Sequence, residues 1–230
     1  MAMIMQFFLV YVGFFFLFTR SNPFTYLKHI IPAQTMAFAC ASSAATIPMT
    51  LKSVQATGRV PKSIARFVVP LGATVNMDGG AIYFPCACIW LAVLNGIEPD
   101  IASYFLLVII STIGSAGTAP VPSASLVLII TAYNTVFNTT GTPAGFSYIL
   151  AIDWFMDRLR TTLNVTGDAV VTGLVAHLCP MGIAGAVVTG LVAHLCPMGI
   201  AGDAVCSNDV EKISESGDGS SDDMIEPVVA

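Results

Sequence analysis

Hydrophobic residues in this chain form long stretches that small and polar residues interrupt at repeated intervals. Met1 to Thr19 contains no charged residue, and a helix of that length spans about 28 Å, close to the hydrocarbon thickness of a bilayer. Arg20-Ser21-Asn22-Pro23 follows it, where a signal peptide would have a small-residue cleavage site. The pattern predicts a transmembrane helix and an interfacial segment over residues 1–32.

Two further apolar stretches have small residues, hydroxyl groups and prolines at their centres. Residues 33–58 contain Ala41-Ser42-Ser43-Ala44-Ala45-Thr46-Ile47-Pro48 and are too short to cross a membrane as one simple helix. Residues 100–134 contain Gly114-Ser115-Ala116-Gly117-Thr118-Ala119-Pro120-Val121-Pro122-Ser123. Each stretch is predicted to form two short helices that meet at a tip, which in a membrane is a re-entrant hairpin.

The other two long apolar stretches carry polar groups at membrane depth. Residues 64–96 are interrupted by Asn76-Met77-Asp78-Gly79-Gly80, which predicts an unwound helix lining a cavity. Residues 147–180 predict a helix on which six polar residues share an arc of about 100°: Asp153, Asp157, Arg160, Thr161, Asn164 and Asp168. Paired interrupted segments of this kind indicate the binding site of a secondary transporter.

Composition supports a multi-pass integral membrane protein. The chain is 55% hydrophobic and 10% charged, whereas a soluble domain has about 25% charged residues. The net charge of −5 reflects acidic residues after Asp203, and no basic patch could follow a nucleic-acid backbone. Four basic residues indicate the cytoplasmic side: Lys52, Arg59, Lys62 and Arg66. The six cysteines suggest neither a disulfide framework nor a metal site.

Several motifs resemble the glutamate transporter family, the sodium:dicarboxylate symporters. They are Phe24-Thr25-Tyr26-Leu27, Ser42-Ser43 with Thr46-Ile47-Pro48, Leu71 to Gly79, and Asp157 with Arg160 to Asp168. The resemblance covers about Phe7 to His177. It implies an α-helical membrane transport-domain fragment, with an inverted repeat of re-entrant hairpin plus transmembrane helix. It also implies elevator-type, sodium-coupled symport of L-glutamate or L-aspartate, rather than enzymatic activity, in a plasma membrane.

The resemblance also implies roles for individual residues. Arg160 matches the arginine that binds the substrate's side-chain carboxylate, a natural bidentate partner, and Asp157 matches the ligand of its α-amino group. The further substrate contacts are Ser43, Thr161 and Asn164. One sodium site comprises Asp168 with Gly72, Asn76 and Asn164; a second comprises Thr74, Met77, Thr112, Ile113 and Ser115; a third includes Asn76 and Asp78.

The chain departs from the family pattern in several places. It lacks the family's amino-terminal half, which supplies the trimerisation scaffold and a helix of the third sodium site. A fragment or incomplete gene model is therefore expected, and a homotrimer only where that scaffold is present. Phe84-Pro85 follows Tyr83 where animal relatives have a glutamate, which makes proton coupling doubtful. Gly80 replaces a threonine, and the second tip has about three extra residues around Thr118 to Pro120.

The carboxy-terminal region contains an identical repeat. Ala169 to Gly185 recurs as Ala186 to Gly202, and a step of that length turns a helix by about −100°, so the copies share no face. We interpret residues 186–202 as a duplicated segment rather than a functional repeat. Residues 203–230 are acidic and rich in serine, and they predict a disordered tail.

Five alternative functions stay open at this point. A neutral amino acid symporter would lack Arg160, and a dicarboxylate symporter would lack Asp157. A non-transporting remnant, associated with full-length relatives, is compatible with the truncation. A channel is compatible with the family's anion conductance. An intramembrane protease would use Asp157 and Asp168 as paired acids, but Arg160 lies between them and Thr166-Gly167-Asp168 lacks the first glycine of a Gly-x-Gly-Asp motif.

Overall fold

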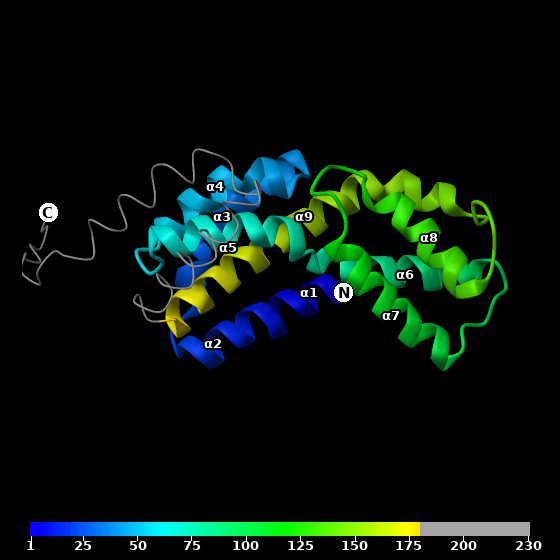
Figure 1. The fold of residues 1–230 in the computed structure, drawn as a ribbon, viewed down its shortest axis with the longest axis horizontal. Coiled ribbons are helices and arrows are strands. Elements are labelled where there is room, and N and C mark those ends of the chain that lie inside the picture. Colours follow the sequence, from blue (N-terminus) through cyan, green and yellow to red (C-terminus); the bar gives the residue numbers. More distant parts are fainter. Residues whose placement is uncertain (180–230) are drawn as a thin grey trace, which may run out of the picture. The chain divides into compact units, whose positions relative to one another are not determined.

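The computed structural model describes residues 1–179, and all regular structure within them is helical. The elements are α1 (Ala2–Met5), the π-helix η1 (Gln6–Val12), α2 (Gly13–Thr19), α3 (Pro23–Cys40), α4 (Ser43–Gln55), α5 (Lys62–Val75), α6 (Asp78–Leu94), α7 (Ile101–Ala116), α8 (Ser125–Phe137) and α9 (Phe146–Leu178) (Figure 1). The duplicated segment 186–202 and the acidic tail 203–230 lie outside the described residues.

The long helix α9 connects two groups of helices. Figure 1 shows α3, α4 and α5 beside its carboxy-terminal part, and all three contact it. Helices α6, α7 and α8 gather at its amino-terminal part, where their apolar side chains form a buried cluster with Ile149. Helix α6 contacts α7, α8 and α9, so it links this cluster to the polar face of α9.

The apolar amino-terminal stretch α1–η1–α2 packs on α9 through a few large side chains. Phe15 is buried and stacks on Tyr26 with ring centroids 4.8 Å apart, while Phe8, Phe16 and Leu17 are each more than half exposed. The stretches Ala2–Thr19 and Lys62–Leu94 are long and apolar enough to cross a membrane, by length and composition only. Exposed apolar side chains suit contact with lipid.

Helix α3 begins earlier than the sequence pattern indicated. Asn22 caps it by accepting a hydrogen bond from the Phe24 N–H at 2.9 Å, and Pro23 occupies its first turn. The predicted interfacial segment and the first arm of the predicted hairpin are therefore one helix. The chain then reverses at Ala41, whose φ of +50° is left-handed, and Ser42 caps α4. Helices α3 and α4 contact each other.

The interruption between α5 and α6 is confined to Asn76 and Met77, neither of which has helical dihedral angles. The helices α7 and α8 are separated by a longer irregular segment, residues 117–124. At the opposite end of α7, Asp100 caps the helix by accepting a hydrogen bond from the Ser103 N–H at 2.8 Å. The Ser103 hydroxyl and N–H together hold the pKa of Asp100 below its usual value.

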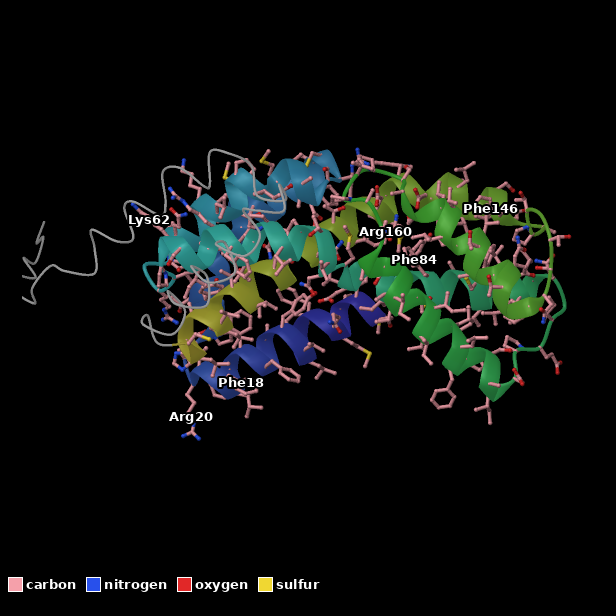
Figure 2. The ribbon with its side chains drawn as sticks, in the orientation of Figure 1. Phe18, Arg20, Lys62, Phe84, Phe146 and Arg160 are labelled. Carbon is pink, nitrogen blue, oxygen red and sulfur yellow. The ribbon has the colours of Figure 1, made fainter. Side chains whose placement is uncertain are left out.

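Basic residues gather at one end of the described unit. The Arg59 guanidinium donates to the Ser21 hydroxyl at 2.9 Å, so the turn after α4 meets the turn after α2. Figure 2 labels Arg20 and Lys62 at this same end. The gathering is what the positive-inside rule requires if this end faces the cytoplasm.

Candidate functional site

The polar stripe of α9 faces other helices rather than the exterior. Exposed fractions are 2% for Asp153, 3% for Arg160 and 2% for Asp168, and Thr161 and Asn164 are also buried. Helix α6 can approach this face closely because Gly79 has no side chain. A Cβ built on Gly79 would lie 2.7 Å from the Arg160 carbonyl oxygen. Figure 2 shows Arg160 where α6 meets α9.

Two carboxylates on its own helix hold the Arg160 guanidinium. Nη2 lies 3.0 Å from Asp153 Oδ1 and 2.9 Å from Asp157 Oδ1, and Nη1 donates to the Ser125 hydroxyl at 2.7 Å. The guanidinium carbon also lies 4.5 Å from the centre of the Tyr83 ring, a cation–π contact. Arg160 Nε and Asp153 Oδ2 are buried with no hydrogen-bond partner. The cation is therefore well positioned and still has donor capacity.

Asp153 is a site residue whose role the sequence did not reveal. It lies on the stripe seven positions before Arg160, which places the two residues on one helix face after about two turns. The sequence signal was thus the i, i+7 spacing of opposite charges in an apolar helix. Because both groups are buried, this pair is the main compensation of the Arg160 charge inside the protein.

A small cavity adjoins this ion-pair cluster. Its volume is about 30 Å³, which leaves room for a few water molecules at most. Its walls include the five predicted substrate ligands, Ser43, Asp157, Arg160, Thr161 and Asn164. The cavity is also lined by the segment between α7 and α8, including Thr118, Pro120 and Val121.

The segment 117–124 is fastened over the cavity by two hydrogen bonds. The Ser42 hydroxyl donates to the Pro120 carbonyl at 2.8 Å, so the two tips meet. The Ser123 N–H donates to Asp157 Oδ2 at 3.0 Å, and Ser123 has a φ of +60°. Asp157 thus binds Arg160 through one oxygen and the tip backbone through the other.

Asp168 lies beside the interruption between α5 and α6. Asn76 Nδ2 donates to Asp168 Oδ1 at 3.1 Å, and a Cβ built on Gly72 would lie 2.5 Å from that same oxygen. Asn164 Oδ1 accepts a hydrogen bond from the Gly79 N–H at 2.7 Å. Three of the four residues predicted for the first sodium site, Gly72, Asn76 and Asp168, therefore lie together, while the side chain of Asn164 contacts Gly79 and Met77. Carboxylate and amide oxygens are ligands of the kind that hard cations prefer.

The residues predicted for the second sodium site are less closely gathered. Thr74, Thr112 and Ile113 are exposed, and the two threonine hydroxyls bond to carbonyls of their own helices. Ser115 is buried, and a Cβ built on Gly80 would lie 3.4 Å from its Cβ. Met77 is buried and lines the small cavity. Of the residues predicted for the third sodium site, Asn76 donates a hydrogen bond to Asp168, and Asp78 accepts one from Tyr11 on η1.

Transition-metal chemistry finds no support in the part of the chain that the structure describes. Residues 1–179 contain no group of three or more His, Cys, Asp or Glu side chains that could hold such an ion. The atoms near Asp168 that could ligate a cation are oxygens, because the Asn76 Nδ2 and Gly79 N–H groups donate hydrogen bonds instead. A weakly bound alkali cation suits such a set better than a soft metal does.

Comparison with known proteins identifies the family. The sequence profile of the sodium:dicarboxylate symporter family matches residues 1–178. The chain therefore belongs to this family. The breaks at Ala41 and Asn76 and the buried polar stripe of α9 lie within the matched region.

Curated relatives include excitatory and neutral amino acid transporters. The chain is 39% identical over 166 residues to excitatory amino acid transporter 5 of Mus musculus, covering 72% of this chain and 29% of that protein. It is 40% identical over 165 residues to excitatory amino acid transporter 1 of Homo sapiens, covering 71% and 30%. It is 39% identical over 165 residues to neutral amino acid transporter A of Bos taurus, also covering 71% and 30%. The chain thus spans less than a third of these relatives' length.

Proposed function

We propose that this chain forms the substrate-carrying part of a sodium-coupled symporter for an acidic amino acid, L-glutamate or L-aspartate. The observation that carries the proposal is the buried Arg160 guanidinium, held against Asp157 beside a small cavity and with Nε unpaired. A cation next to a carboxylate matches the two charged ends of such a substrate. The family and the names of the relatives support the same class.

Substrate binding proceeds by exchange of partners in this proposal. The substrate's side-chain carboxylate accepts two hydrogen bonds from the Arg160 guanidinium in a bidentate contact. The substrate's ammonium group pairs with the Asp157 carboxylate, which then no longer accepts from the Ser123 N–H. Thr161, Asn164 and Ser43 bind the remaining polar atoms from the cavity wall. Since each lost contact is replaced by a substrate contact, charges stay paired while the site fills.

Sodium binding supplies the coupling in this proposal. An ion at Asp168, Asn76 and Gly72 would tie the α5–α6 interruption to α9, and Asn164 would transmit this order to the cavity that it also lines. The second and third sites involve Met77 with Ser115, and Asp78. Binding of ions and substrate then favour each other, because each orders residues that the other needs.

Movement across the membrane is proposed to follow the family's elevator mode. The segments α3–α4 and α7–α8 serve as re-entrant hairpins of an inverted repeat, with the 117–124 segment as the gate. Membrane lipid surrounds the exposed apolar faces. A trimer in the plasma membrane is proposed for the protein that contains the family's scaffold.

A neutral amino acid transporter is the second candidate, because neutral amino acid transporter A is about as similar to the chain as the excitatory amino acid transporters are. Arg160 decides between the two. When Asp157 pairs with the substrate ammonium, the buried guanidinium needs another anion, which an acidic side chain supplies and a neutral side chain does not.

The test is binding and uptake by the purified chain reconstituted in liposomes. We expect sodium-dependent uptake of radiolabelled L-aspartate, inhibition by L-glutamate, and loss of both in Arg160→Ala. In detergent, L-aspartate should raise the unfolding temperature in sodium but not in choline. Retained L-aspartate uptake and stabilisation in Arg160→Ala would contradict the assignment of Arg160. Stabilisation by L-serine instead of L-aspartate would favour the neutral candidate, and no response to any of them would overturn the proposal.

A further inference from the structure

Tyr11 makes a polar contact from a mostly apolar helix into the sodium-site region. Its side chain is 4% exposed, and its hydroxyl donates to Asp78 Oδ2 at 2.6 Å. Tyr11 lies in η1, a π-helical stretch (Gln6–Val12) between two α-helical ones. Such stretches are rare and frequently occur at functional sites, because the wider turn re-aims a side chain.

Three polar groups from three elements converge where Tyr11 reaches α9. A Cβ built on Gly167 would lie 2.8 Å from the Tyr11 hydroxyl, 3.0 Å from Asn76 Nδ2 and 3.1 Å from Asp78 Oδ2. The missing side chain at Gly167 therefore provides the space in which these groups meet. Asn76 also donates to the next residue of α9, Asp168. Tyr11, Asn76, Asp78 and Asp168 thus belong to one connected cluster.

From this geometry we infer that Tyr11 is a positioning residue that sets the sodium affinity of the site containing Asp78. The inference rests on the proposed sodium-coupled function. The phenol occupies one oxygen of the Asp78 carboxylate and fixes its rotamer, which leaves the other oxygen for a cation. The resemblance to the family gave Tyr11 no role.

The expected size of the effect follows from the type of hydrogen bond. A hydrogen bond to a charged group contributes enough that its loss changes an equilibrium constant by about tenfold. Tyr11→Phe removes the hydroxyl and keeps the ring that packs between α1–η1–α2 and α9. The carboxylate then gains rotational freedom, which sodium must remove on binding. The half-saturating sodium concentration should therefore rise about tenfold.

The experiment is a sodium titration of the whole chain in detergent, at constant ionic strength with choline. The unfolding temperature is followed by the fluorescence of Trp90 and Trp154. Tyr26→Phe is the matched control: Tyr26 is also buried, and its hydroxyl donates to the Ala169 carbonyl of α9 at 2.6 Å rather than to a carboxylate. Tyr26→Phe should lower stability at every sodium concentration and leave the half-saturating concentration within about twofold.

A double-mutant cycle with Asp78→Asn separates positioning from general stabilisation. In the Asp78→Asn background, Tyr11→Phe should cause no further rise in the half-saturating concentration. Each titration starts at saturating sodium and lowers the concentration stepwise. A variant that is folded only when the ion is bound can therefore still be measured. An unchanged concentration in Tyr11→Phe, an equal rise in Tyr26→Phe, or additive effects in the cycle would each overturn the role of Tyr11. An unfolding temperature of the wild-type chain that does not change with sodium concentration would instead overturn the proposed function.

Discussion

Asp153→Asn tests whether the buried ion pair holds the site in its observed form. The substitution keeps the shape of the side chain and removes its charge. Asp153 and Arg160 are 2% and 3% exposed and lie 3.0 Å apart, so water cannot replace the lost carboxylate. Removing one partner of a buried pair costs about 3–5 kcal/mol. The lower end applies here, because Asp157 still contacts the same guanidinium at 2.9 Å.

Thermal unfolding in detergent measures this loss. At about 2–4 °C per kcal/mol for a chain of this size, a loss of about 3 kcal/mol lowers the unfolding temperature by about 6–12 °C. Asp157→Asn is the matched control, because it contacts the same Nη2 atom but is 14% exposed. Partial hydration compensates for part of the loss there, so its unfolding temperature should fall less.

The substrate response provides a second readout of the same variant. With Asp153 neutral, Arg160 is less compensated and attracts an anion more strongly. L-aspartate should therefore raise the unfolding temperature of Asp153→Asn by more than it raises that of the wild type. The reasoning is refuted if Asp153→Asn unfolds within about 2 °C of the wild type, or if Asp157→Asn is the more destabilised of the two.

Four further predictions concern single residues. Arg160→Cys should shift uptake from L-aspartate toward L-serine, and an unchanged preference in competition assays would contradict the role of the guanidinium. Asp168→Asn should raise the sodium concentration that gives half-maximal uptake by about tenfold. An unchanged concentration would count against that site. Gly79→Ala should destabilise the chain by about 1–3 kcal/mol, because its Cβ meets the backbone of α9, and denaturant unfolding measures the loss. Below about pH 4, the unfolding temperature of Asp100→Ala should depend less on pH than that of the wild type. The hydrogen bonds that lower the Asp100 pKa stabilise the fold at pH values above the pKa of the unfolded chain, and this stabilisation is lost as the pH falls.

Local patterns in the sequence located the break at Asn76 and the polar face of α9, but not the start of α3. Asn76-Met77-Asp78-Gly79-Gly80 predicted a break, and the helices end and begin again there. The polar arc on α9 predicted one shared face, and that face is buried. These features depend on helical periodicity and on backbone groups within a few residues of each other. The start of α3 was missed because Asn22-Pro23 was taken for an interface rather than for a helix cap.

Contacts between distant residues were decided only by the tertiary structure. Tyr11 and Asp78 are 67 residues apart, and Ser42 and Pro120 are 78 apart, so no periodicity connects either pair. The partners of Asp153 could be placed on one face, but only packing determined that water is excluded and that the charges must pair. The resemblance grouped Thr112 with Ser115, yet α7 exposes the first and buries the second. The sequence alone determined which polar groups enter the apolar helices, and packing determined which of them meet, because the cost of burying each one depends on the partner that the fold brings to it.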